Sequence, residues 1–244
     1  MWMGSRVVVV VPAWDEAPRV GRMLRGIPPW VDSIVVVDDA SRDGTAEAAR
    51  AVGDRRVEVI RHRRNRGVGA AIATGYKRAL TSAKHPRDAF VVMAGDGQMD
   101  PADLVSLVTP VARDEADYVK GNRFRSPDVA RVMPATRFVG SLFFSWATSR
   151  AVGIPISDSQ CGYTAIAADA CARLELDALW PGYGYPNDVL SQLALRKMRV
   201  AEAPVRAVYA DEVSRLRSRH VPIVAALVAR AWVRRVFAVR SDQF

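Results

Sequence analysis

The sequence predicts an α/β protein built on a mostly parallel sheet with helices on both faces. Short β-branched runs such as Val7 to Val11 are apolar throughout, as the buried strands of a parallel sheet are. Segments with helical patterns separate these runs at the spacing of β–α units. Acidic, turn-forming residues follow several of the runs, at the sheet edge where such folds bind ligands.

The first half of the chain alternates strand and helix. The run Ser33 to Asp39 repeats the pattern of the first strand and ends in two adjacent acids. Pro28 and Pro29 end the first helix, and Asp43 is expected to cap the second. We expect strands at 7–11, 33–39, 57–60 and 89–93, and helices at 19–26, 45–52 and 70–82.

The second half is less regular, and it ends in a basic tail. The tail, Val221 to Val239, is amphipathic, and Arg230, Arg234 and Arg235 would each be costly at the centre of a bilayer. We therefore expect a surface helix that either lies on anionic lipid or packs on the domain. Other expected helices are 103–112, 137–152 and 189–197; expected strands are 116–121 and 200–208, the last at a sheet edge.

Composition limits the class of protein. The 244 residues suit one α/β domain of generous size or a domain with a small appendage, and half of them are hydrophobic, enough for a substantial core. Cys161 and Cys171 form neither a disulfide framework nor a CxxC pair, so we expect a reducing cytoplasm. The N-terminal residues lack the apolar length of a signal peptide, and we expect none.

The net charge of +9 indicates an anionic partner, such as a phosphate-bearing substrate or an anionic membrane surface. The basic residues fall into separate clusters at 61–66, 215–219 and 230–240. Because they do not form one continuous patch, we expect no nucleic-acid partner. The sequence leaves the oligomeric state open.

The stretch from Val91 to Pro101 points to chemistry. Its apolar strand stops at a small polar cluster with Asp96, Gln98 and Asp100. Hard divalent cations prefer such carboxylate and amide oxygens, and they often share them with the phosphates of a substrate. The alternative is a turn followed by a helix cap, with Asp100 as the cap and Pro101 in the first turn.

Acids gather at several strand ends, and they favour a nucleotide site. Like charges at one edge are destabilising unless cations or hydrogen-bond donors share the site. A nucleotide supplies base N–H groups and ribose hydroxyls, and a metal ion neutralises its diphosphate. The alternative is that each acid caps the helix that follows it. Gly67 and Gly69 are a weak dinucleotide signal, because Ile72 stands at the third glycine position.

Six ordered segments between about residues 6 and 217 resemble motifs of the family 2 glycosyltransferases with the GT-A fold. The likeness is greatest to the branch of dolichyl-phosphate mannosyltransferase-like and polyprenyl-phosphate sugar transferases. The segments 12–16, 36–45 and 65–70 resemble P-x-Y-N-E, V-V-D-D-G-S-x-D-G-T and N-x-G-x-G-x-A, with Ala40 in place of a glycine. The segments 95–101, 121–123 and 158–163 resemble the D-A-D-G-Q-x-D-P metal loop, G-S-R and D-x-x-x-G-F/Y.

The resemblance implies a Rossmann-like GT-A catalytic domain over residues 1–217, followed by the basic amphipathic helix of residues 218–244. It implies an inverting transfer of a hexose from a UDP- or GDP-sugar to a polyprenyl phosphate. We expect the protein in the cytoplasm, peripheral at the inner face of the membrane. Two alternatives are transfer to a saccharide hydroxyl in cell-surface glycan synthesis and a catalytically silent nucleotide-sugar binding protein.

The resemblance also assigns roles to residues. Ala94 stands where the family has the first Asp of its metal loop, so the Mg²⁺ or Mn²⁺ role passes to Asp96 and Gln98, with weak binding expected in the absence of nucleotide. Asp188 aligns with an acidic residue that acts as base or positions the acceptor; capping the following helix is the alternative. Expected nucleotide-binding residues are Pro12, Ala13, Trp14, Glu16, Asp38, Asp39, Arg66, Gly67, Gly97 and Arg217, and expected acceptor-binding residues are Arg123, Arg137 and Gln160.

Overall fold

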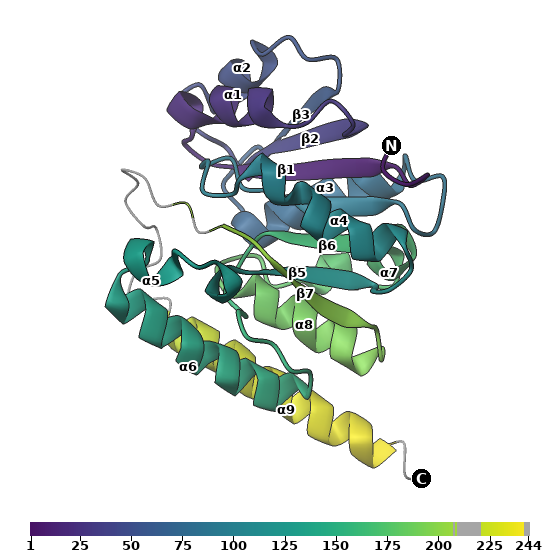
Figure 1. Ribbon diagram of the computed structural model, residues 1–244, viewed down its shortest axis with the longest axis vertical. Coiled ribbons are helices and arrows are strands. Elements are labelled where there is room, and N and C mark those ends of the chain that lie inside the picture. The colour runs from purple at the N-terminus through teal and green to yellow at the C-terminus, as the bar shows by residue number, and fades with distance from the viewer. Residues whose placement is uncertain (207, 209–220, 242–244) are drawn as a thin grey trace.

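A twisted sheet flanked by helices runs through the protein (Figure 1). The computed structural model describes residues 1–206, 208 and 221–241. Within these residues the sheet has seven strands in the order β3-β2-β1-β4-β6-β5-β7. They are β1 (Val7–Ala13), β2 (Ser33–Asp38), β3 (Val57–Arg61), β4 (Ala89–Val92), β5 (Tyr118–Asn122), β6 (Thr164–Ala167) and β7 (Val200–Pro204).

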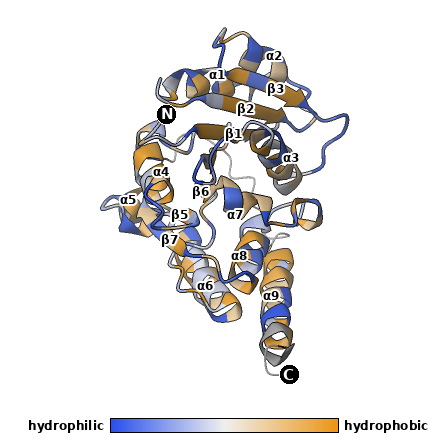
Figure 2. Ribbon diagram, turned by 90° about the vertical axis from the view of Figure 1, so that its right-hand side faces the viewer, coloured by the Kyte–Doolittle hydropathy of each residue, from blue (hydrophilic) through white to orange (hydrophobic). Residues whose placement is uncertain are grey.

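Helices cover both faces of this sheet, with α3 and α4 on opposite sides in Figure 2. Helix α3 packs on β1 and β2, and helix α4 packs on β4, β5 and β6. The helices are α1 (Ala17–Gly26), α2 (Thr45–Arg50), α3 (Val68–Leu80), α4 (Leu104–Ala112), α5 (Val129–Val132), α6 (Ala135–Val152), α7 (Ala168–Ala172), α8 (Tyr185–Leu195) and α9 (Val221–Ser241).

The apolar runs form the central parallel strands, as predicted. Strand β1 pairs in parallel with β2 and with β4, and β2 pairs in parallel with β3. All residues of β1 are buried, which is why this run shows no polar alternation. Strand β7 lies at the edge of the sheet, also as predicted.

One strand runs against the others. Strand β6 lies between β4 and β5 and is antiparallel to both. The sequence does not predict this direction, because it depends on where the chain re-enters the sheet. Since β6 enters in reverse, the loop before it, 158–163, lies beside the carboxyl ends of β4 and β5. This reversal brings a late part of the chain to the ligand-binding edge.

Helices α6 and α9 lie next to each other across the end of the molecule remote from α1 and α2 (Figure 1). Both contact α8, and α9 buries Val224, Leu227 and Ala231. The basic tail is therefore a helix that packs on the domain, which was one of the two expectations from the sequence. No helix in the described ranges is long and apolar enough to cross a membrane.

The turn after β2 contains a backbone conformation that is unfavourable for its residue. Ala40 has φ of 61°, in the left-handed region that favours glycine. The resembling family motif has a glycine at this position. Ala40 lies between Asp39 and Ser41, whose contacts hold the turn, and the strain is tolerated because those contacts fix it.

Ala40→Gly should therefore stabilise the protein by about 0.5–1 kcal/mol, because relief of the left-handed strain exceeds the added chain entropy of glycine. Urea unfolding curves measure this difference. Ala48→Gly in helix α2 is the matched control and should destabilise by about 1 kcal/mol. A loss of stability in both variants would contradict the strain at Ala40.

Candidate active site

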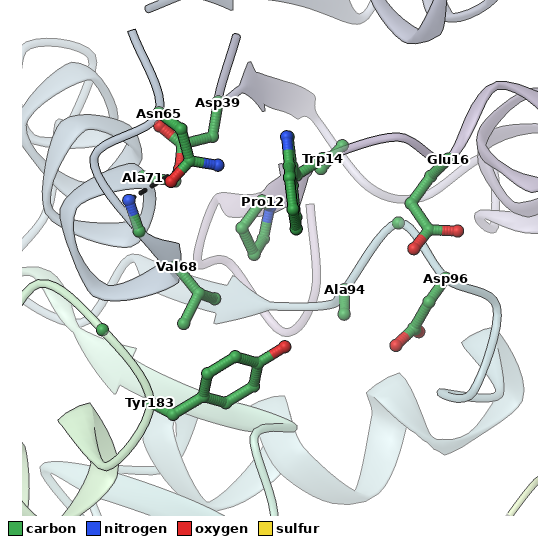
Figure 3. A pocket seen from close by; sticks show the side chains of 14 residues that line it. Pro12, Trp14, Glu16, Asp39, Asn65, Val68, Ala71, Ala94, Asp96 and Tyr183 are labelled. Carbon is green, nitrogen blue, oxygen red and sulfur yellow. Dashed lines mark hydrogen bonds between the residues drawn. The ribbon is translucent and has the colours of Figure 1, made fainter. Parts of the chain in front are cut away.

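A cavity opens at the carboxyl ends of β1, β2 and β4 (Figure 3). In Figure 3 the Trp14 ring stands in its middle, with Asp39 and Asn65 on one side and the carboxylates of Glu16 and Asp96 on the other. The lining comes from the strand ends, the start of α3 and the loop before α8. It consists of Pro12, Ala13, Trp14, Glu16, Asp39, Asn65, Gly67, Val68, Ala71, Ala94, Gly95, Asp96, Gly182 and Tyr183.

Asp39 fixes the shape of this cavity. Its Oδ1 accepts hydrogen bonds from the backbone N–H of Arg66 at 2.9 Å and lies 2.7 Å from His62 Nδ1. Its Oδ2 accepts from the N–H of Gly67 at 2.7 Å. A buried carboxylate is tolerated only with such donors around it. Asp39 therefore ties the end of β2 to the loop that opens α3.

The glycines of that loop allow two backbones to approach closely. A Cβ atom at Gly67 or Gly69 would overlap a carbonyl oxygen of Pro181 or Trp180. The N–H of Gly69 donates to Pro181 O at 2.7 Å. The segment 180–184, which carries Tyr183 into the cavity, thus rests on the start of α3. Close packing of backbone segments explains the glycine pattern here, as it does in other β–α turns.

Asp38, predicted to bind nucleotide, does not line the cavity. It is fully buried, its Oδ1 accepts from Ser41 N at 3.0 Å, and Oδ2 lies 3.1 Å from Arg61 Nε in an ion pair whose geometry falls short of a hydrogen bond. Asp38 therefore stabilises the turn after β2 from within the protein. Alternate residues of a strand point to opposite faces, so two adjacent acids do not share one direction.

The remaining nucleotide predictions have different outcomes. Arg66 is exposed, and its side chain is not among those that line the cavity. Gly97 has φ of 78° and forms the turn beside Asp96. Arg217 lies outside the described residues. Contacts of these three residues with a nucleotide stay predictions.

The loop after β4 brings Asp96 into the cavity. Its Oδ1 accepts from Gln98 N at 3.0 Å, which closes a tight turn. No three Asp, Glu, His or Cys side chains converge on a metal-binding point in the described part of the chain. The oxygen of Asp96 is a suitable ligand for Mg²⁺ or Mn²⁺. Because Ala94 replaces a second carboxylate, an ion here would depend on oxygens from a bound diphosphate.

The residues predicted to bind an acceptor come together in a second cavity. Gln98 and Met99 are among its lining residues, so the loop that carries Asp96 contributes to both cavities. Arg123, Arg137 and Gln160 all line it. Hydrogen bonds from Arg123 Nε at 2.8 Å and Nη2 at 2.9 Å hold both oxygens of the fully buried Asp158. This bidentate pair fixes the guanidinium at the cavity wall.

Burial alone would raise the pKa of Asp158, but the hydrogen bonds and charge of Arg123 outweigh it, so the pKa lies below its ordinary value. The carboxylate is therefore ionised at neutral pH, and the ion pair with Arg123 persists. Lys120, which is also fully buried, adds positive charge behind the same carboxylate and donates to Cys161 O.

Asp188, predicted to act as base or acceptor ligand, lines neither of these two cavities. It is buried in the first turn of α8, where Oδ2 accepts from Trp180 N at 2.9 Å. Arg230 and Arg234 of α9 both donate to its Oδ1. The helix-capping alternative is wrong, because Gly184 occupies the N-cap and no side chain caps this helix end, whereas the role as base or acceptor ligand stays a prediction. Asp188 links α8, α9 and the segment 180–184.

Sequence reasoning missed several cavity residues. Tyr183 and Asn65 line the cavity, and His62 supports Asp39 from a buried position, with Nε2 3.0 Å from Thr74 Oγ1. Asn65 belongs to the segment that matched a family motif, so a signal for it was present. Tyr183 precedes α8 by two residues, and only the contact between α3 and the segment 180–184 places it at the site.

The mostly parallel sheet with a cavity at its carboxyl edge has the GT-A fold. Residues 8–174 match the family model for Glycosyl transferase family 2, and the chain belongs to that family.

The similarity to named relatives extends beyond this matched region. The chain is 32% identical over 212 residues to undecaprenyl-phosphate mannosyltransferase from Micrococcus luteus, covering 82% of each chain. It is 28% identical over 220 residues to UDP-N-acetylglucosamine–dolichyl-phosphate N-acetylglucosaminyltransferase from Methanococcus voltae, covering 84% of this chain and 86% of that one.

A solved structure shares the fold. Glucosyl-3-phosphoglycerate synthase from Mycobacterium tuberculosis, in complex with phosphoglyceric acid, superposes with a TM-score of 0.66 at 20% identity, covering 93% of this chain and 80% of that chain. The same synthase has been crystallised with Mn²⁺, UDP-glucose and phosphoglyceric acid.

Gly69→Ala should destabilise the protein by roughly 2 kcal/mol, because the added Cβ would overlap Trp180 O and force the segment 180–184 away from α3. Thermal unfolding measures the effect. Gly140→Ala is the matched control: a Cβ there meets no atom within 4 Å, and alanine favours the helix, so stability should hold or rise. Equal melting temperatures for wild type and Gly69→Ala would contradict the close approach.

Proposed function

We propose that this glycosyltransferase moves a hexose from a UDP- or GDP-linked donor to a polyprenyl phosphate, with inversion at the anomeric carbon. One observation carries the proposal: residues of the loop 94–99 line two cavities, of which the first also has carboxylates in its lining and the second arginines. A nucleoside diphosphate fits the first and a phosphate monoester fits the second. The named relatives that act on undecaprenyl and dolichyl phosphates support the choice of acceptor.

The donor cavity offers complementary groups along a nucleotide. Trp14 presents a partly exposed aromatic plate on which a base can stack. Asp39 accepts three hydrogen bonds within the protein, and a carboxylate has about four acceptor positions, so a ribose hydroxyl or base N–H can share it. The end of the cavity with Asp96 is then left for the diphosphate.

Asp96 would hold a Mg²⁺ or Mn²⁺ ion together with diphosphate oxygens. Gln98, the other predicted metal ligand, lines the second cavity and not the first. When bound, such an ion neutralises charge on the departing nucleoside diphosphate. The turn that Gln98 N closes on Asp96 keeps the carboxylate directed at the cavity. This arrangement predicts weak metal binding by the protein alone and strong binding with the nucleotide present.

On the acceptor side, Arg123 and Arg137 would hold the lipid phosphate. A phosphate monoester has a second pKa of about 6, so at neutral pH its oxygen is already a competent nucleophile. That oxygen attacks the anomeric carbon as the bond from the anomeric carbon to the diphosphate oxygen breaks, and the nucleoside diphosphate leaves with the electron pair. No side chain needs to remove a proton, in keeping with the engagement of Asp188 by two arginines.

A lipid acceptor requires the enzyme to work at a membrane surface. We propose that the protein is cytoplasmic and peripheral at the inner face of the membrane. The basic composition is favourable for contact with anionic lipid. Residues 1–217 would form the catalytic domain, with the C-terminal helix attached to it.

Two alternatives give different results in one assay panel. The panel tests UDP-glucose, UDP-N-acetylglucosamine and GDP-mannose, each with undecaprenyl phosphate in detergent micelles or with a soluble saccharide. Transfer to the lipid phosphate alone is the expected result. Transfer to the saccharide alone would replace the proposed acceptor, and binding of a donor without turnover of any substrate would identify a silent binding protein.

Asp96→Asn should lower the transfer rate by at least about 100-fold, since the charge that holds the ion at the diphosphate is lost. Radiolabelled sugar transferred to lipid phosphate measures the rate, and EDTA should imitate the variant until Mn²⁺ is restored. Glu115→Gln is the control; this exposed acid pairs with Arg113 at 3.9 Å, lines neither cavity and should not affect turnover. Unchanged turnover in Asp96→Asn, at an unchanged melting temperature, would remove the metal role.

A further inference from the structure

Helix α6 is built with its apolar side outward. Its buried positions are small and mostly polar, among them Ser141, Ser145 and Thr148. Its exposed positions are large and apolar: Val139 is 64% exposed, Leu142 42%, Phe143 60% and Trp146 60%. A surface helix of a water-soluble domain has the opposite distribution.

Hydrogen bonds hold this orientation. Ser145 Oγ accepts from Ser159 N at 2.8 Å, and Thr148 Oγ1 donates to Asn187 Oδ1 at 2.8 Å. Ser149 Oγ donates to Ile156 O at 2.8 Å. Rotating the helix to bury its aromatic side would leave these polar groups without partners. The exposure of Phe143 and Trp146 is therefore a stable feature of the fold.

Helix α9, which contacts α6, also exposes apolar side chains. It packs beside α6 on α8 and buries Leu227 and Ala231, so the opposite side of the helix faces away from the domain. That opposite side carries Trp232, Val233 and Phe237, which are 57%, 42% and 63% exposed. We call the sides of the two helices that carry these exposed side chains the α6/α9 face. Figure 1 shows the two helices next to each other.

The charge on these two helices has one sign. Neither helix contains Asp or Glu, and their arginines are Arg137, Arg150, Arg230, Arg234, Arg235 and Arg240. Asp188 of α8 pairs with Arg230 and Arg234 and compensates part of this charge. A second copy docked face to face would set basic helices against each other. An anionic lipid surface provides opposite charge at its headgroups and an apolar layer beneath them.

We propose that the α6/α9 face docks on an anionic lipid bilayer, with the aromatic side chains at the boundary between headgroups and acyl chains. Trp and Phe favour this boundary, where apolar and polar surroundings meet. The docking surface stands on the two helices; its link to catalysis rests on the proposed function.

That link is made by helix α6. Arg137, in the first turn of α6, lines the second cavity, and Val139 and Phe143 follow on the exposed side of the same helix. A polyprenyl phosphate can therefore keep its chain in the bilayer while its phosphate reaches Arg137. The same helix that contacts lipid delivers a wall residue of the acceptor cavity.

Vesicle flotation tests the surface with the full-length protein and with the double variant Phe143→Ser/Trp146→Ser. The vesicles are phosphatidylcholine alone or phosphatidylcholine with phosphatidylglycerol. Wild type should bind the anionic vesicles at least tenfold more strongly than the neutral ones, and added salt should weaken this binding. The double variant should bind the anionic vesicles at least tenfold more weakly than wild type. Val105→Ser, an exposed apolar residue on α4, is the matched control and should bind as wild type does.

Equal binding of wild type and the double variant to anionic vesicles would overturn the proposal. So would a wild-type dimer that the double variant converts to a monomer, measured by light scattering without lipid, if neither protein floats with vesicles. That outcome would assign the face to a second copy of the chain.

Activity separates this proposal from the proposed function. The double variant should transfer sugar to a short, water-soluble polyprenyl phosphate at the wild-type rate and lose at least tenfold with undecaprenyl phosphate embedded in vesicles. If wild type does not use the soluble acceptor, the proposed function fails, whereas the flotation result still decides whether the α6/α9 face binds lipid.

Discussion

The buried carboxylate of Asp39 is the constraint on which the donor cavity depends. It accepts from the backbone of Arg66 and Gly67 and lies beside His62, so the end of β2 determines the path of the loop that opens α3. That loop in turn supports the segment 180–184 through the bond from Gly69 N to Pro181 O. A buried charge is costly unless donors surround it, and here the donors are the backbone of the ligand-binding loop. The group that stabilises the fold locally is thus the group that shapes the site.

The loop 94–99 contributes residues to both cavities. Asp96 faces the cavity with Trp14 and Asp39, whereas Gln98 and Met99 face the cavity with the arginines. Attack and departure in a sugar transfer with inversion occur on opposite sides of one carbon, so donor and acceptor must approach from different directions. Two cavities that share one loop and have side chains of opposite charge in their linings fit this requirement. The antiparallel β6 makes the second cavity, because its reversed entry places the segment 158–163 beside the ends of β4 and β5.

The parts of this structure that the sequence predicts are those controlled by local pattern. The β-branched runs form the central strands, and Asp39 and Asp96 reach the cavity because strand ends of parallel β–α units meet at one edge. Position in sequence does not determine which of two adjacent acids faces the ligand, and Asp38 turned inward to Ser41. The direction of β6, the place of Tyr183 and the pairing of Asp188 depend on contacts between distant segments. The outward apolar side of α6 was also missed, since a helical pattern does not state which of its sides meets the domain.

The same pairing of Asp188 attaches the C-terminal helix to the rest of the protein. One carboxylate oxygen takes Arg230 and Arg234 from α9, and the other takes the N–H of Trp180, at the start of the segment that carries Tyr183. Leu227 of α9 also packs where a Cβ of Gly184 would be, so that glycine position is required by the helix. Helix α9 therefore braces the wall of the donor cavity from outside, while α6 supplies Arg137 to the acceptor cavity. The two helices that expose apolar side chains away from the domain are thus also the helices that contact the walls of the two cavities.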